Sequence, residues 1–356
     1  MFKIIDIYIG RTIIATSALC LATLIGLSSI IKYVDQLRKV GEGSYDLLHA
    51  LFYVLLTIPR DIEMFFPMAV LLGALMGLGM LATSSELTVM QVSGYSKLDI
   101  GFSVLKTALP LMLFILALGQ WGAPQAQKMA LELRSFSLSG GRIVSLLRGV
   151  WAKDANDFIY IGRAEDEHLT AISIWKFNDK KELFSVVTAK EADYLSDNLW
   201  QMNDVIVTDM ENGVQLSRVH YDAYEWKTSL APDKLAVVSV KPEELALSGL
   251  YDYVSYLKDS EQDPSRYELA FWRKVFQPVS IAVMMLLALS FVFGPLRSVT
   301  MGARILSGVI AGFAFYISSE FFGPLSLVYQ VPPVLGALAP SIVFMLVAVL
   351  LLRRKL

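Results

Sequence analysis

The sequence is poor in the residues that build metal sites, disulfides and nucleophilic active sites. Its 356 residues include one cysteine, Cys20, and three histidines, His49, His168 and His220. A zinc site or a disulfide framework needs several such residues, so both are excluded, as is a Cys/His catalytic pair. No G-x-x-x-x-G-K-[ST] phosphate loop occurs, which excludes nucleotide hydrolysis by that device. We expect no catalytic residue, no metal and no bound cofactor in this chain.

Charge is also scarce. Charged residues make up 18% of the chain, whereas soluble domains average about 25%. Hydrophobic residues make up 55% and the mean hydropathy is +0.52, which excludes a disordered chain and argues against a single soluble globule. The formal net charge of −2 is too close to zero to indicate a nucleic-acid partner.

What the chain has instead is long apolar runs. Crossing a bilayer takes about 20 mostly apolar residues, and six windows reach that length: residues 12–31, 59–81, 101–121, 275–293, 305–322 and 334–352. No window has an ionisable residue near its centre, unlike transporters driven by protons or sodium. The sequence therefore predicts six transmembrane helices and an energy source on another chain.

Basic residues near the helix ends indicate the orientation. With six spans both termini lie on one side, and most of the flanking basic residues fall on that side: Lys3, Arg11, Arg297, Arg304, Arg353, Arg354 and Lys355. This predicts cytoplasmic termini. One loop opposes the rule, because Lys32, Arg38 and Lys39 follow the first window on the outer side. We call these three residues the basic collar.

A functional use would explain the basic collar. If the first helix continues past the membrane surface, Lys32, Asp35 and Lys39 share one face, and Asp35 can pair with Lys39. Cations there suit the phosphate groups of an acidic amphiphile, because such contacts are charge-assisted. Arg134 is a further candidate. The alternatives are snorkelling cations at a solvated helix end and, for Arg134, a solvated helix face.

Residues 123–270 form a different kind of sequence. They hold 16 basic and 24 acidic residues, a net charge of −8 against +6 for the rest of the chain. Period-two alternation, broken by polar turns such as Asn178-Asp179 and Asn212-Gly213, predicts an all-β domain outside the membrane: a sandwich, a jelly roll or an open barrel. Either a repeated hairpin or chance explains four tryptophans at intervals of 24 to 26 residues: Trp151, Trp175, Trp200 and Trp226.

The loop between the second and third windows predicts a short cytoplasmic helix at about residues 84–94. Thr83 and Glu86 have capping-box spacing. Leu87, Val89 and Met90 form a modest apolar side. An interfacial helix on the lipid surface is the alternative, but such helices are usually basic, and this segment has no Lys or Arg. An exposed carboxylate at Glu86 suits the docking of a cytoplasmic partner.

Two G-x-x-x-G spacings lie within apolar windows, at Gly73 and Gly77 and at Gly308 and Gly312. In a membrane, small residues at this spacing let helix backbones approach closely. They predict tight helix packing, either within this chain or against a second chain.

Three runs of residues carry a resemblance to a known family: IIKYVDQLRK at 30–39, FFPMAVLLGALMGLGMLATSSELTVMQVSGYS at 65–96 and FQPVSIAVMMLLALSFVFGPLRS at 276–298. The chain resembles the lipopolysaccharide-transport permease family, LptF/LptG, over nearly its whole length. The resemblance implies helices 1–3 with the coupling helix in residues 1–122, a periplasmic β-jellyroll in 123–270, and helices 4–6 in 271–356.

The resemblance also implies a function and partners. It implies the permease subunit of an ABC transporter of the bacterial inner membrane, which extracts lipopolysaccharide from the outer leaflet and passes it toward the outer membrane. The implied partners are an LptF-like sister permease, an LptB-like ATPase dimer that uses ATP, and an LptC-like single-span periplasmic protein. The resemblance favours lipid contacts by the basic collar, Asp35 and Arg134, and ATPase contacts by Glu86, Leu87, Met90 and Tyr95.

Two other classes of function remain open. A membrane-anchored periplasmic enzyme is disfavoured, because no Ser-His-Asp, metal or paired-carboxylate constellation is evident. A mechanotransmission permease would move the periplasmic domain without carrying lipid. A lipid carrier needs an apolar pocket open to the outer leaflet beside helices 1 and 5, and this feature distinguishes the two.

Overall fold

Long helices and an antiparallel sheet make up the described part of the chain. The computed structural model describes residues 3–138, 147–154, 156–165, 167–196, 198–211, 215–228, 230, 232, 241–259, 262–293 and 300–353. The expected turn at Asn212-Gly213 and the basic residues Arg297, Arg354 and Lys355 lie outside these residues.

Among the described residues, six helices are long and apolar enough to cross a membrane. Their bounds are α1 (Ile4–Leu37), α2 (Leu47–Thr83), α4 (Lys97–Ala117), α8 (Ser265–Phe293), α9 (Met301–Val328) and α10 (Pro333–Arg353). A π-helical turn, η1 (Leu118–Gly122), joins α4 to its continuation α5 (Ala123–Leu138). Each predicted window falls in one of these spans, so the predicted three-plus-three arrangement is confirmed.

The helices extend well beyond the apolar windows. α2 begins at Leu47 rather than near residue 59, and the third span continues through α5 to Leu138 rather than ending near residue 121. The two extensions meet, since the backbone N–H of Ser44 donates to the carbonyl of Ser137 at 2.8 Å. Apolar windows mark the stretch suited to lipid, whereas packing against neighbours keeps a helix intact beyond it.

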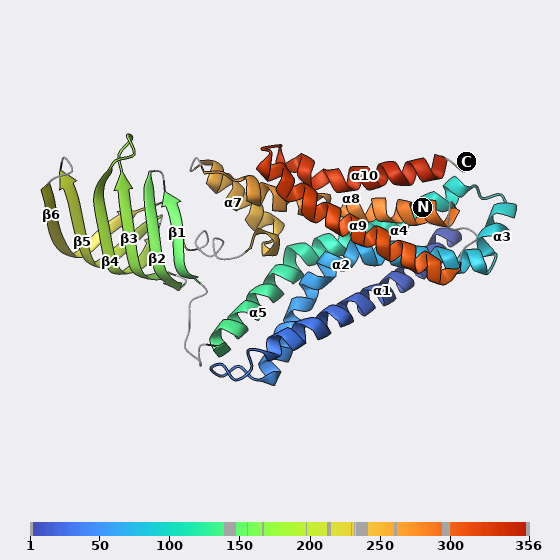
Figure 1. The fold of residues 1–356 in the computed structure, drawn as a ribbon, viewed down its shortest axis with the longest axis horizontal. Helices are drawn as coiled ribbons and strands as arrows, with labels where there is room; N and C mark the ends of the chain where they lie inside the picture. Colours follow the sequence, from blue (N-terminus) through green and yellow to red (C-terminus); the bar gives the residue numbers. More distant parts are fainter. Residues whose placement is uncertain are drawn as a thin grey trace.

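The sheet and the short helix α3 (Glu86–Val92) lie at opposite ends of the helical bundle (Figure 1). The chain termini lie at the same end as α3 (Figure 1). We call these two ends the α3 end and the sheet end.

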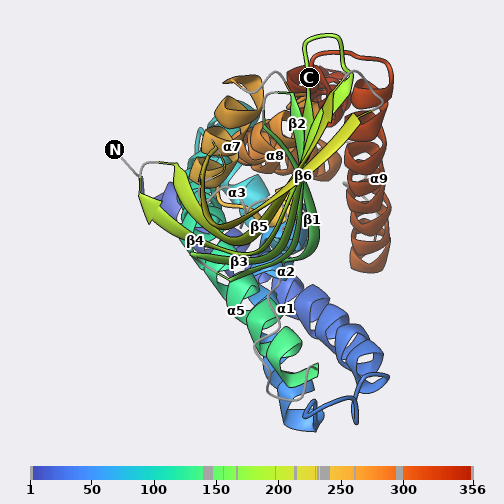
Figure 2. The same ribbon diagram turned by 90° about the vertical axis from the view of Figure 1, so that its left-hand side faces the viewer.

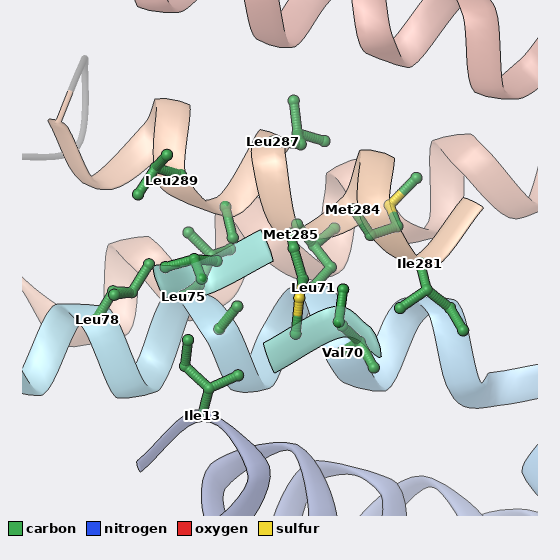
Figure 3. Packing of buried hydrophobic residues seen from close by; sticks show 14 of the residues in the cluster. Ile13, Val70, Leu71, Leu75, Leu78, Ile281, Met284, Met285, Leu287 and Leu289 are labelled. Atoms are coloured by element: carbon green, nitrogen blue, oxygen red, sulfur yellow. The ribbon is translucent and has the colours of Figure 1, made fainter. Parts of the chain in front are cut away.

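α2 and α8 form the centre of the bundle. α2 contacts α1, α5, α8 and α9, and α8 contacts α2, α4 and α10. Branched side chains and methionines fill the space between them (Figure 3): Val70, Leu71, Leu75, Leu78, Ile281, Met284 and Met285. α1 reaches this core through Ile13 (Figure 3).

The inserted domain is an antiparallel sheet. Its strands are β1 (Leu147–Asp154), β2 (Asp157–Glu165), β3 (His168–Phe177), β4 (Leu183–Ser196), β5 (Leu199–Glu211) and β6 (Gln215–Lys227). Each described strand pairs with the next one in the chain, so the described strands form a meander without the crossovers of a jelly roll. The sheet is strongly curved (Figure 2). The prediction of an inserted all-β domain is confirmed.

One face of the sheet carries the core of this domain. Alternate residues of β2 and β3 point into it, and three residues of helix α7 (Leu247–Asp259) join the same cluster: Ile159, Ile161, Ile172, Ile174, Tyr253, Tyr256 and Leu257. The tryptophans do not share one position. Trp200 is buried beside Trp226, whereas Trp151 is exposed and stacks on Trp175 at 5.1 Å. A repeated hairpin unit is therefore not supported.

Candidate functional sites at the two ends of the bundle

The basic collar lies where α1 ends, at the sheet end of the bundle. α1 stops at Leu37, Arg38 is its C-cap, and Lys39 lies in the following turn. The predicted continuation of the helix through Lys39 is therefore wrong. The chain turns instead, with Gly41 at a φ of +98° and its N–H donating to the carbonyl of Tyr45. The ion pairs of the described residues do not include the predicted Asp35–Lys39 pair.

Lys32 is held by α2. Its Nζ lies 2.5 Å from Oδ1 of Asp61 and 3.4 Å from Oγ1 of Thr57. The Asp61 carboxylate is buried, and 34% of the Lys32 side chain remains exposed. Lys32 is thus more than a snorkelling cation, because it neutralises an interior carboxylate while its outer part reaches the surface.

Arg134 of α5 also contacts α2. Its guanidinium lies 5.2 Å from the centre of the Tyr53 ring, and Nη1 donates to the Tyr53 hydroxyl at 3.3 Å. Tyr53, Thr57 and Asp61 are spaced by four residues and so form one stripe along α2. The structure therefore brings Lys32 and Arg134 to one stripe of α2, whereas Arg38 and Asp35 are exposed near the end of α1.

The turn after α1 is anchored by a buried tyrosine. The Tyr45 hydroxyl donates to Oε1 of Gln36 at 3.3 Å, and both side chains are buried. Burial raises the pKa of Tyr45 to about 12, so the hydroxyl stays protonated and keeps donating. This contact fixes the turn that carries Lys39.

A charged turn of α2 connects three other elements. Arg60 pairs with Glu244 in the 3₁₀ helix η2 (Pro242–Glu244), which follows the sheet in the chain. Asp61 pairs with Lys32 of α1, and Glu63 pairs with Lys274 of α8 at 2.8 Å. Because α2 begins at Leu47, Glu63 lies close to the middle of the helix but near the start of the apolar window 59–81. The prediction that no window carries an ionisable residue near its centre is therefore not contradicted. Paired carboxylates are not free proton carriers.

At the α3 end the predicted capping box is wrong. α2 continues through Thr83, whose hydroxyl donates to the carbonyl of Gly79 at 2.9 Å, and the N-cap of α3 is Ser85. The Glu86 carboxylate accepts instead from the Tyr8 hydroxyl at 2.7 Å and from Oγ of Ser84 at 2.9 Å. Glu86 therefore links α3 to α1.

The two faces of α3 differ in exposure. Leu87 is buried in the bundle core and Met90 packs against that core. These two residues therefore anchor α3 on the bundle, and their role in docking stays a prediction. The exposed apolar side chains are Val89, which was expected on the apolar side, and Val92, which the sequence pattern did not single out although its spacing from Val89 places both on one face. The predicted Tyr95 lies under the ammonium of Lys3, 5.7 Å from the ring centre.

The four G-x-x-x-G glycines lie at contacts within this chain. A Cβ on Gly73 would be 2.3 Å from Cα of Ser17, and one on Gly77 would be 3.4 Å from Cα of Ile13. Gly308 and Gly312 of α9 face side chains of α2, Leu75 and Met68 respectively. The backbone approach at Gly73 lets Oγ1 of Thr16 donate to its carbonyl at 2.6 Å.

Two apolar cavities open elsewhere on the bundle. One of about 130 Å³ lies between α4, α8 and α10, and one of about 430 Å³ lies between α4, η1, α7 and α8. Neither is lined by α1 or α9, where a lipid carrier was expected to have its pocket. Within the described residues no group of histidine, cysteine or carboxylate side chains could hold a metal ion.

Comparison with known proteins gives a match along the whole chain. A family model described as "Lipopolysaccharide export system permease LptF/LptG" matches residues 7–354. The chain is 51% identical over 356 residues to the lipopolysaccharide export system permease protein LptG of Escherichia coli strain K12, covering 99% of each chain. It is 48% identical over 357 residues to the LptG protein of Haemophilus influenzae, covering 100% of this chain and 99% of the relative. The resemblance found in three runs of residues is confirmed.

Proposed function

The chain belongs to the LptF/LptG family of lipopolysaccharide export permeases, and we propose that it is the permease subunit that extracts lipopolysaccharide from the outer leaflet of the inner membrane and passes it toward the outer membrane. The observation that carries this function is the identity of 51% over 99% of both chains. A shared fold alone would not suffice, but this match includes the helices, the sheet and the loops that join them. The chain is a transporter subunit and not an enzyme.

The permease acts in a multi-component complex with a sister permease, and α1 and α9 are the helices suited to face that sister. Only 11% of the most apolar stretch of α1 and 17% of that of α9 are buried within this chain. Large apolar side chains are exposed on both helices: Leu19, Leu27, Ile310 and Phe313. A lipid pocket beside α1 and α9 would then have the sister chain as its other wall.

The α3 end suits a cytoplasmic ATPase dimer. Val89 and Val92 present a small apolar surface, and Glu86 lies beside it with its carboxylate tied to α1. A force applied to α3 would therefore reach α1 directly. In this orientation both termini are cytoplasmic and the sheet is periplasmic, where an LptC-like single-span protein would join it.

The sheet end suits the headgroup of the lipid. Lys32, Arg38, Lys39 and Arg134 gather cations there against the usual charge rule, and Asp35 lies among them. The inserted segment has a net charge of −8 and is a poor partner for phosphate, so its apolar interior would take acyl chains instead.

Site-specific photocrosslinking tests this function. A photoreactive residue at position 35, one turn from Lys32, should crosslink to lipopolysaccharide in the assembled complex. Position 128 is the matched control, because Lys128 is on α5, is 74% exposed and pairs with Glu132. Crosslinks no more frequent at position 35 than at position 128, with normal ATPase activity, would support the mechanotransmission alternative. The full-length relation to export permeases favours lipid transport.

A further inference from the structure

The Lys32–Asp61 pair joins a surface cation to a buried anion. Nζ of Lys32 is 2.5 Å from Oδ1 of Asp61, and the two residues come from α1 and α2. Within the described residues the carboxylate also accepts from Oγ of Ser28, at 3.4 Å to Oδ2. Arg60, the adjacent cation on α2, is engaged by Glu244. Among the described residues, Lys32 is therefore the cation that neutralises Asp61.

An anion that binds Lys32 from outside must compete with Asp61. An ammonium has three donors, and in this structure Lys32 directs donors to Asp61 and Thr57. A phosphate at the exposed side of Lys32 would meet a cation whose charge is already balanced, so the net attraction is reduced. The buried carboxylate cannot follow the lysine outward, since it is fixed on α2 and shielded from water.

We propose that Asp61 is the positioning residue that limits how tightly the collar holds a phosphate-bearing amphiphile. It draws the Lys32 ammonium inward when the site is empty and restores that position when the lipid leaves. This inference rests on the proposed function, because it takes Lys32 as a contact to the lipid headgroup. Its consequence is that neutralising Asp61 strengthens lipid retention and slows release, the opposite of what loss of a structural contact would do.

The central experiment compares lipopolysaccharide retained per permease after purification of the complex. Asp61→Asn keeps the shape of the side chain and one accepting oxygen but removes its charge. Retention should rise roughly two- to fivefold, the factor expected for a partly exposed ion pair, and release on ATP addition should slow. Asp61→Glu restores the charge and should return retention to the parental level. Thr57→Val removes the weaker neutral contact and should leave retention near that level.

Two further arms identify the ligand chemistry. Lipopolysaccharide stripped of its phosphates should show no gain in retention with Asp61→Asn, because the freed ammonium has no anion to bind. Inorganic phosphate should compete with intact lipopolysaccharide more effectively in Asp61→Asn than in the parental complex. A gain that persists with the stripped lipid would overturn the proposal.

The charge-swap variant separates this inference from the proposed function. Lys32→Asp should lower retention, and the double variant Lys32→Asp/Asp61→Lys should not recover it, although the pair is restored in reverse. Full recovery would mean that the pair is only structural and would remove Lys32 from the lipid site. If instead Lys32→Asp lowers retention but Asp61→Asn leaves it unchanged or lower, the lipid contact stands and the role of Asp61 is wrong.

Discussion

α1 and α2 have nearly the same length and hydropathy but differ in how much of each is buried within the chain. They have 34 and 37 residues, and their most apolar stretches have mean hydropathies of 2.0 and 2.1. Yet 67% of that stretch of α2 is buried within the chain, against 11% for α1. The hydropathy of a helix shows whether it suits lipid. Because lipid is as apolar as a leucine-rich core, hydropathy does not determine whether the helix contacts lipid or other helices.

Small residues account for the difference. α2 presents Gly73 and Gly77 to α1 on one side and receives Gly308 and Gly312 of α9 on another. Each glycine allows a close approach, so α2 is surrounded by helices. α1 is close to α2 along one face and leaves its other faces exposed, which suits a helix that also meets a second chain or lipid.

The largest expected effect comes from closing the approach between these two helices. In Gly73→Leu a Cβ alone would be 2.2 Å from Oγ and 2.3 Å from Cα of Ser17, so α1 must move away from α2. We expect a loss of at least about 4 kcal/mol in the free energy of unfolding, measured by thermal unfolding in detergent. Gly26→Leu on α1 is the control, since a Cβ at Gly26 meets nothing within 4 Å. Equal stability of the two variants would refute the packing explanation.

Two leucine-to-alanine substitutions, one on each helix, should give a smaller difference in stability. Leu71 of α2 is fully buried, whereas Leu19 of α1 is 60% exposed. Leu71→Ala should cost about 2 kcal/mol, at the low end of the range for buried leucines, because packing is lost in a medium that supplies little hydrophobic transfer energy. Leu19→Ala should leave the stability of this chain unchanged but weaken its association with the sister permease. A destabilised monomer after Leu19→Ala would contradict the exposure of α1.

The α3 end of the bundle gives a smaller effect, on a partner rather than on the fold. Glu86→Arg should leave the chain inserted but weaken ATPase copurification about tenfold, which corresponds to about 1.4 kcal/mol. Tyr8→Phe is the control, because it removes the hydrogen bond to Glu86 while keeping the carboxylate. Normal copurification and lipid-stimulated hydrolysis in Glu86→Arg would remove this residue from the docking surface.

The smallest effect concerns the start of α2. The Asp46 carboxylate accepts from the His49 N–H at 2.9 Å, and this bond and the His49 ring lower the pKa of Asp46 below its ordinary value of 3.8. A lowered carboxyl pKa stabilises the folded state above the ordinary value, and the contribution is lost as the pH falls through the lowered one. Hydrogen exchange at the His49 amide should therefore be protected at neutral pH and less so in acid. Protection in Asp46→Asn, which keeps an acceptor without a charge, should not change over that range.

The six spans and the sheet could be predicted because each depends on a local pattern. A helix crossing the bilayer must satisfy its backbone internally over about 20 apolar residues, and a strand with one buried face must alternate, as Ile159 and Ile161 do in β2. Helix ends were harder to predict. The capping box at Thr83 failed because α2 had not yet ended there. α2 starts earlier than predicted, and it packs against α5.

The sequence by itself determined the family, the number of spans, the inserted sheet and the unusual cations near the end of α1. Only the tertiary structure decided what those cations contact. Lys32 pairs with Asp61, which is 29 residues further along the chain. Asp61 lies on α2, at the start of the apolar window 59–81 that the sequence predicts. The ion pair between Lys32 and Asp61 depends on how α1 and α2 pack, and the close backbone approach at Gly73 determines that packing. The physical reason is that a span is specified by its own residues, whereas an ion pair between two spans is specified by the register of their packing.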